Sequence, residues 1–197
     1  MDLTFSCRCA QVSGTVVNYR RSQANRVVCY CGDCRGFVDW LKQPEHVDAH
    51  GGVDILHLAQ GDVRINQGHE LVACMRLSPK GMFRFYATCC STPLGSTMSA
   101  GFPLVGFPTT ILDASVDRAQ ILGPALVVNG ASALAGPVEE RKLAVFGMLI
   151  RVGTLLAQWK ITGRGKPSPY FNDQGQPVAV ANVITKDERA ALASTRA

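Results

Sequence analysis

The sequence predicts a mainly β protein of small antiparallel sheets, with one long helix packed on it toward the C-terminal end. Three observations support this class. Over the first hundred residues, short β-branched runs alternate with Gly, Pro and Asn turn signals. All eight cysteines lie within residues 1–90, in closely spaced groups. An apolar segment at about residues 138–161 carries the start and stop signals of a helix.

Length and composition indicate a globular protein. The 197 residues are 47% hydrophobic and 18% charged, and we expect a β domain over 1–100 and an extension over 101–197. The net charge of +5 is spread without a basic run, so no nucleic-acid partner is expected. The N-terminus lacks the pattern of a signal peptide, and Arg151 interrupts the longest apolar stretch. These features predict a cytoplasmic protein that makes no membrane contact.

The first cysteine motif is a C-x-C in residues 3–18, which we expect to form two short strands joined by a turn at the motif. Cys7 and Cys9 stand two positions apart, so on extended backbone they share a face and both thiolates can reach one ion. Two thiolates do not complete a tetrahedral site. A second pair of ligands must therefore come from elsewhere in the chain.

The second motif is a C-x-C-x-x-C formed by Cys29, Cys31 and Cys34 at the end of an expected strand over 26–31. Three thiols around one turn favour a metal site, with zinc the best candidate, over a chance cluster of structural thiols. A short helix is expected over 33–42, with the aspartate at its first position as the cap. Cys34 would then lie at a helix N-terminus, where the dipole and a metal both lower a thiol pKa.

A meander of short strands is expected between this motif and the last cysteines. Its final strand alternates, so Arg84 would point to the face opposite Phe83 and Phe85. Ser78 to Gly81 supplies the turn residues of a hairpin loop before that strand. The expected strands cover residues 54–58, 63–66, 70–77 and 82–86.

Cys89 and Cys90 follow the last strand of this meander and supply the pair that Cys7 and Cys9 lack. Adjacent cysteines in a turn can both face one ion, although with strain. Alternatively, one of them binds the ion and the other is free, and Cys74 on the preceding strand could reach the same region as a ligand or a resolving thiol. Cys74 is otherwise expected to be a buried core thiol.

The four histidines show no paired spacing that would suggest metal binding, and surface or loop positions are expected for them. His50, which precedes two glycines, is the histidine that could serve as a ligand or proton-transfer group. In the helix over 138–161, Glu139 and Glu140 would occupy the first turn. Its broad apolar face is expected to dock on the core, with a homodimer contact as the alternative: Leu143, Phe146, Leu149, Ile150, Leu156 and Trp159.

Taken together over residues 3–100, the C-x-C, the C-x-C-x-x-C and the late pair followed by Ser-Thr-x-Leu form a specific pattern. The pattern resembles the glutathione-dependent formaldehyde-activating enzyme family, also called the GFA or CENP-V domain, which has an Mss4-like fold. The resemblance implies a structural zinc at the outer cysteines and a second, more labile zinc at the C-x-C-x-x-C. The first set maps to Cys7, Cys9, Cys89 and Cys90, and the second to Cys29, Cys31 and Cys34.

In that family the middle cysteine of the second motif, matched by Cys31, engages the glutathione thiol. The resemblance therefore implies carbon–sulfur bond chemistry on a glutathione adduct such as S-hydroxymethylglutathione. The sequence departs from the family pattern in two places. Ala10 stands where a glycine usually follows the first C-x-C, and the late C-x-x-C-G is replaced by Ala87 and then Cys89-Cys90-Ser91. The last hundred residues have no counterpart in a minimal family member, which suggests a divergent subfamily with a substrate other than formaldehyde.

Three functional hypotheses follow. The first is a zinc-dependent, carbon–sulfur lyase-type enzyme acting on a small-molecule thiol adduct, with Cys31 as its catalytic residue. Three thiolates on zinc leave a fourth position open, as a reactive site requires. The second is a non-catalytic, zinc-stabilised module for protein interaction. The third is a thiol redox sensor that uses Cys89 and Cys90, or Cys74.

Overall fold

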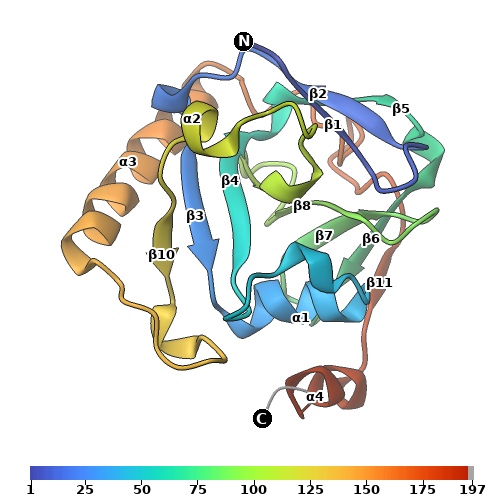
Figure 1. Ribbon diagram of the computed structural model, residues 1–197. Helices are drawn as coiled ribbons and strands as arrows, with labels where there is room; N and C mark the ends of the chain where they lie inside the picture. The colour runs from blue at the N-terminus through green and yellow to red at the C-terminus, as the bar shows by residue number, and fades with distance from the viewer. Residues whose placement is uncertain (195–197) are drawn as a thin grey trace.

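The computed structural model describes residues 1–194 and consists of two β-sheets with four α-helices around them. The larger sheet has eight strands in the order β10-β3-β4-β9-β8-β7-β6-β11, and the smaller has three in the order β1-β2-β5 (Figure 1). The predicted mainly β class is confirmed. The strands are β1 Leu3–Ser6, β2 Ser13–Val16, β3 Asn25–Cys29, β4 Val53–Ala59, β5 Val63–Gln67, β6 Val72–Arg76, β7 Phe83–Ala87, β8 Pro93–Thr97, β9 Leu104–Pro108, β10 Leu126–Val128 and β11 Ala181–Val183. The helices are α1 Gly32–Trp40, α2 Arg118–Leu122, α3 Lys142–Ile161 and α4 Lys186–Ser194.

Strand positions match the prediction better than strand pairing does. β1 and β2 form the expected antiparallel hairpin, with Leu3 opposite Val16, so the two strands around the C-x-C turn are confirmed. The predicted pairing of successive strands in the meander is wrong for its first half. β4 pairs with β3 and β9, and β5 leaves to pair with β2 in the small sheet. Val63 and Ile65 of β5 are buried there in the same core cluster as Val16, a non-local contact that strand order does not reveal.

The two faces of the large sheet have different surroundings, because side chains alternate along each strand. Phe85 on β7 is fully buried against the rings of Tyr170 and Phe171, at centroid distances of 4.7 and 5.6 Å. Leu56, Leu58, Val105 and Phe107 belong to the same core cluster. Arg84 lies on the opposite face from Phe83 and Phe85, as predicted, and lines a cavity there.

The hydroxyl group of Tyr170 should contribute more to stability than that of Tyr19, although both side chains are buried. The Tyr170 hydroxyl donates to the Leu94 carbonyl at 2.8 Å, whereas the buried Tyr19 hydroxyl has no hydrogen-bond partner among the described residues. Tyr170→Phe is expected to lower the free energy of unfolding by about 1–2 kcal/mol. The matched control Tyr19→Phe removes an unsatisfied group and should leave stability unchanged or raise it. Urea unfolding of both variants measures this, and an equal loss in both would contradict the assignment.

The C-terminal half of the chain supplies both edges of the large sheet. β10 runs parallel to β3, with Val128 opposite Cys29, and β11 runs parallel to β6. In Figure 1 α3 runs beside β10 and β3, while α4 lies near α1. The strands of residues 101–197 therefore belong to the sheet that carries the second cysteine motif, and β10 pairs directly with the strand that ends in Cys29.

Helix α3 begins later than predicted and docks through a different face. The Val138 amide donates to the Gly130 carbonyl, and the Glu140 carboxylate accepts from the Gly130 amide, so residues 138–140 are held against the loop after β10 instead of opening the helix. The buried side chains of α3 are Met148, Leu155 and Trp159. The predicted docking face is wrong in most of its members, since Leu143, Phe146, Leu149 and Ile150 are exposed.

The exposed side of α3 is unusually apolar for a helix on a sheet. By length and composition this helix meets the minimum for a membrane span, and 17% of its most apolar window is buried within the fold. A core helix of a soluble protein meets the same criterion, so this is weak evidence for a membrane. The expected absence of membrane contact and the homodimer contact through this helix both stay predictions.

Candidate metal centres

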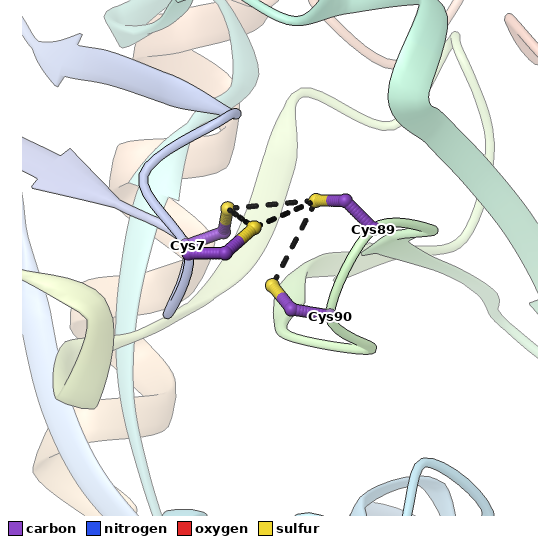
Figure 2. A group of neighbouring side chains, drawn as sticks. Cys7, Cys89 and Cys90 are labelled. Atoms are coloured by element: carbon purple, nitrogen blue, oxygen red, sulfur yellow. Dashed lines mark hydrogen bonds between the residues drawn. The ribbon is translucent and has the colours of Figure 1, made fainter.

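The first cysteine group joins the hairpin turn between β1 and β2 to the loop between β7 and β8. Figure 2 shows the sulfurs of Cys7, Cys89 and Cys90 directed toward one another from these two loops. The Sγ atom of Cys89 lies 3.2 Å from that of Cys9, 3.7 Å from that of Cys7 and 3.8 Å from that of Cys90. All four sulfurs lie within 4.8 Å of one another, so residues 80 positions apart in sequence form one cluster.

Local hydrogen bonds shape both loops of this cluster. The Cys7 amide donates to the Val12 carbonyl at 2.8 Å, and the Val12 amide returns a bond to Cys7 Sγ at 3.3 Å. The Ala87 amide donates to the Thr92 carbonyl at 2.9 Å, which closes the turn that carries Cys89 and Cys90. Each loop is thus closed by its own hydrogen bonds, which position the cysteines that it carries.

The four thiols fit a tetrahedral metal ion. With metal–sulfur bonds of about 2.3 Å, as in zinc sites, neighbouring sulfurs would be roughly 3.8 Å apart. The closest sulfur contacts here span 3.2–3.8 Å. Cys74 lies outside the group, 1% exposed in the core, and burial raises the pKa of its thiol to about 11. In the structure Cys89, and not Cys74, belongs to the first cysteine group. Cys74 is an inert core thiol, poorly suited to redox sensing.

The second cysteine group is built on the end of β3 and the start of α1. Cys29 ends the strand, Cys31 is the N-cap of the helix and Cys34 lies in its first turn, with the three sulfurs within 4.8 Å of one another. The predicted cap is wrong. The Cys31 sulfur, not Asp33, accepts from the Cys34 amide at 3.4 Å, because the helix starts one residue earlier. The Asp33 carboxylate instead pairs with Arg189 of α4 at 2.8 Å.

Ionisation of all three thiols in the second group would require a bound cation. Thiol hydrogen bonds from Cys29 and Cys34 lower the pKa of Cys31. Hydrogen bonds with Cys31 raise the pKa of Cys29, and hydrogen bonds with Cys29 and then Cys31 raise the pKa of Cys34. Thiolates this close together oppose one another's ionisation, and a bound metal would allow all three to ionise. Within residues 1–194 no fourth Cys, His, Asp or Glu ligand atom joins the group. A metal held here would keep one coordination position free of protein.

Asn129, from the C-terminal half of the chain, donates a hydrogen bond to the second group, a contact that the sequence did not predict. Its side-chain amide donates to the Cys29 sulfur at 3.5 Å, from the loop that follows β10. Its backbone is left-handed, with φ of 58°, a conformation that asparagine tolerates better than most residues. Exactly one hundred positions separate the two residues, and only the parallel pairing of β10 with β3 brings them together.

A cavity of about 210 Å³ adjoins the second group and is bordered by Cys29 and Cys34. It lies between the helices α1 and α3 and the face of the large sheet that is turned away from the main core cluster. Its walls are mainly apolar and include Val27, Phe37, Val53, Ile55, Met82 and Met148. The polar side chains that line it are Arg84, His57 and Ser96.

His57 was expected at the surface, but it lines this cavity from β4. Burial lowers the pKa of His57 to about 4, so its ring is neutral at pH 7, and its Nδ1 atom has no hydrogen-bond partner among the described residues. His50 is exposed and belongs to neither cysteine group. The alternation of β4, with Leu56 and Leu58 in the core, was the one sequence signal that could have placed His57 on the other face.

Comparison with known proteins gives a family without an activity. The model of a family of unknown function, DUF6151, matches residues 2–182. No curated protein matches the chain. A crystal structure of a Rhodobacter sphaeroides protein aligns with 64% of this chain and 99% of that chain, at 16% identity and a TM-score of 0.44. This similarity is too low to support an argument about fold or function.

Proposed function

The chain belongs to the family of unknown function DUF6151, and from its cysteine chemistry we propose a carbon–sulfur lyase-type enzyme. Its substrate would be the adduct of a thiol, such as glutathione, with a small aldehyde. Zinc would be held structurally by the outer cysteines and, more loosely, by the second group. The outer set is Cys7, Cys9, Cys89 and Cys90, and the second is Cys29, Cys31 and Cys34.

One observation carries the proposal: a three-thiol group with no fourth protein ligand among residues 1–194 borders a mainly apolar cavity. Structural zinc sites take four protein ligands, whereas catalytic sites keep a position for water or substrate. The outer group, with four cysteines, has the composition of a structural site. The two groups therefore differ in the way that separates a structural centre from a reactive one.

The reaction balances without an oxidant or reductant. The adduct R–S–CH(OH)–R′ loses its hydroxyl proton, the carbonyl forms, and the C–S bond breaks with its electron pair going to sulfur. The released sulfur takes up a proton, which gives R–SH and O=CH–R′. A divalent metal would stabilise the thiolate form of the leaving sulfur at neutral pH. His57, whose ring is neutral at pH 7, lines the cavity and can orient the hydroxyl group through a hydrogen bond.

Backbone geometry at the two replaced glycines supports the family resemblance. Ala10 has φ of 60° and Ser91 has φ of 57°, and both values lie in the left-handed region that favours glycine. These are the positions at which the formaldehyde-activating family carries glycine after its cysteine pairs. The turns have kept the conformation that glycine adopts readily, which fits descent from such a pattern.

The proposal is tested by turnover with and without metal. Purified protein is mixed with glutathione and a series of small aldehydes, and release or formation of the adduct is followed by NMR. We expect turnover by the zinc-loaded protein, its loss after brief chelation that leaves the fold intact, and its return on adding zinc. Adduct exchange no faster than in buffer, with both metal sites filled, would contradict the proposed activity.

A second candidate, a non-catalytic interaction module, is favoured by the exposed face of α3. Leu143 is 89% exposed and Phe146 63%, on a helix whose other side packs on the core. The occupant proposed for this face is a second copy of the chain. Sedimentation velocity tests it, since a dimer should dissociate in Phe146→Glu, and a wild-type monomer at high concentration would exclude this contact.

A further inference from the structure

We propose that the cavity beside Cys29 and Cys34 binds a small carboxylate with an apolar carbon skeleton, which Arg84 recognises. This inference rests on the proposed function, because the carboxylate would be the aldehyde-derived part of the thiol adduct. It names the substrate class that the proposed activity leaves open. One buried cation, the size and polarity of the cavity walls, and the position of the cavity support it.

Arg84 is a buried cation without an acidic partner in the part of the chain that the structure describes. The residue is 3% exposed, and none of the ion pairs among the described residues involves it. Its Nη1 atom makes one long hydrogen bond to Ser96 Oγ, at 3.4 Å, and its Nε atom has no partner in the described part of the chain. Arginine is almost never buried this deeply unless it is paired. The guanidinium therefore has unused donors inside the fold.

The guanidinium is positioned by an aromatic face instead of by a carboxylate. Its Cζ atom lies 5.5 Å from the centroid of the Phe37 ring on α1. A cation–π contact of this kind uses none of the N–H donors, so the planar fork stays available to a bidentate ligand. Carboxylates match that fork, which makes a carboxylate the anion that this arrangement fits best.

The rest of the cavity selects an apolar skeleton. At about 210 Å³ it exceeds the roughly 150 Å³ apolar cavity that suffices to bind benzene. It is also smaller than the roughly 300–1,000 Å³ typical of pockets for drug-sized ligands. A complete glutathione adduct would not be enclosed, so the tripeptide would stay outside and the smaller part of the adduct would enter. Among the residues that the structure describes, no carboxylate side chain lines the cavity to compete for Arg84.

The cavity lies beside the second cysteine group, and this position connects it to the proposed reaction. The same cavity is bordered by Cys29 and Cys34 on one side and by Arg84 and His57 from the sheet. A ligand anchored by its carboxylate at Arg84 would place its other end toward the cysteines. The aldehyde carbon would then belong to the end away from the carboxylate.

The test compares ligands that differ only in charge. Binding of benzoate and benzamide, and of hexanoate and hexanamide, is measured by calorimetry on the zinc-loaded protein. We expect each carboxylate to bind at least about 10-fold more tightly than its amide. Arg84→Met should abolish this preference, and Arg84→Lys should retain part of it. The control Arg76→Met removes an arginine that stacks on Phe83 outside the cavity, and it should leave the preference unchanged.

Two results would overturn the inference: equal affinity for carboxylate and amide, or a preference that survives in a folded Arg84→Met protein. If Arg84 served only to offset the thiolate charge, Arg84→Met would weaken zinc binding without changing ligand preference, which also contradicts the proposal. Measuring the same ligands on Cys31→Ser separates the two claims. Retained carboxylate binding together with absent thiol-adduct turnover in wild type would refute the proposed reaction but not the pocket.

Discussion

Cys31→Ser is expected to abolish thiol-adduct turnover while leaving the fold intact. Cys31 is the one thiol of its group whose pKa is lowered, and its sulfur also caps α1. Serine can still cap the helix, because a hydroxyl oxygen accepts the Cys34 amide as well as sulfur does. It cannot replace a thiolate on a soft-ligand metal site. We therefore expect turnover to fall by roughly 100-fold or more, with the second metal lost.

The control for this experiment is Cys74→Ala, which removes a cysteine that belongs to neither group. Truncation in the core should cost some stability but leave metal content and turnover at the wild-type level. Activity is followed with glutathione adducts, and folding by circular dichroism. Full turnover in a Cys31→Ser protein that has lost its second metal would contradict the role of this group.

Cys90→Ser should produce the largest change in stability. The outer group ties the β1–β2 turn to the loop after β7, so losing its metal releases a link between the two sheets. Binding free energy at a structural metal site is folding free energy. A loss of even about 4 kcal/mol would lower the melting temperature by roughly 8–16 °C for a chain of this size. Scanning calorimetry with and without a chelator measures the shift.

Thr92→Val tests whether the loss of stability in Cys90→Ser comes from the loss of the metal. The Thr92 hydroxyl lies 3.1 Å from the Cys90 sulfur and accepts from the Arg8 amide, but it belongs to no ligand set. This variant should lose much less stability than Cys90→Ser and should keep its metal. If chelation left the melting temperature of wild type unchanged, the outer group would not be a structural metal site.

Local pattern predicted most of the elements but not their partners. The alternation and turn signals placed β1, β2, β6 and β7 within a few residues of their observed bounds. They did not show that β5 leaves for the small sheet, because backbone pairing between distant strands has no local signal. Helix α3 shows a second limit. It is apolar nearly all round, so its periodicity could not select the docking face, which is set by Met148, Leu155 and Trp159.

The cysteines were the predictable part of the site. Spacing predicted the group of Cys29, Cys31 and Cys34, and the family resemblance implied the outer group, with Cys74 left as an alternative ligand. The structure brings the seven predicted cysteines together in two groups, without Cys74. Arg84, His57 and Asn129 carry no motif. Arg84 was placed on the correct face by alternation, but nothing in the sequence indicated that α1 and α3 would cover that face. Asn129 depends on the pairing of β10 with β3, which only the fold supplies.

The central claim is that the second cysteine group holds a metal with one open position. X-ray absorption at the zinc edge, combined with metal analysis of wild type and Cys31→Ser, tests it most directly. The account predicts that wild type binds one more zinc per chain than the variant. It also predicts that the difference signal fits three sulfur atoms and one lighter oxygen or nitrogen atom. Equal zinc content in the two proteins, or four sulfur ligands at the lost site, would contradict it.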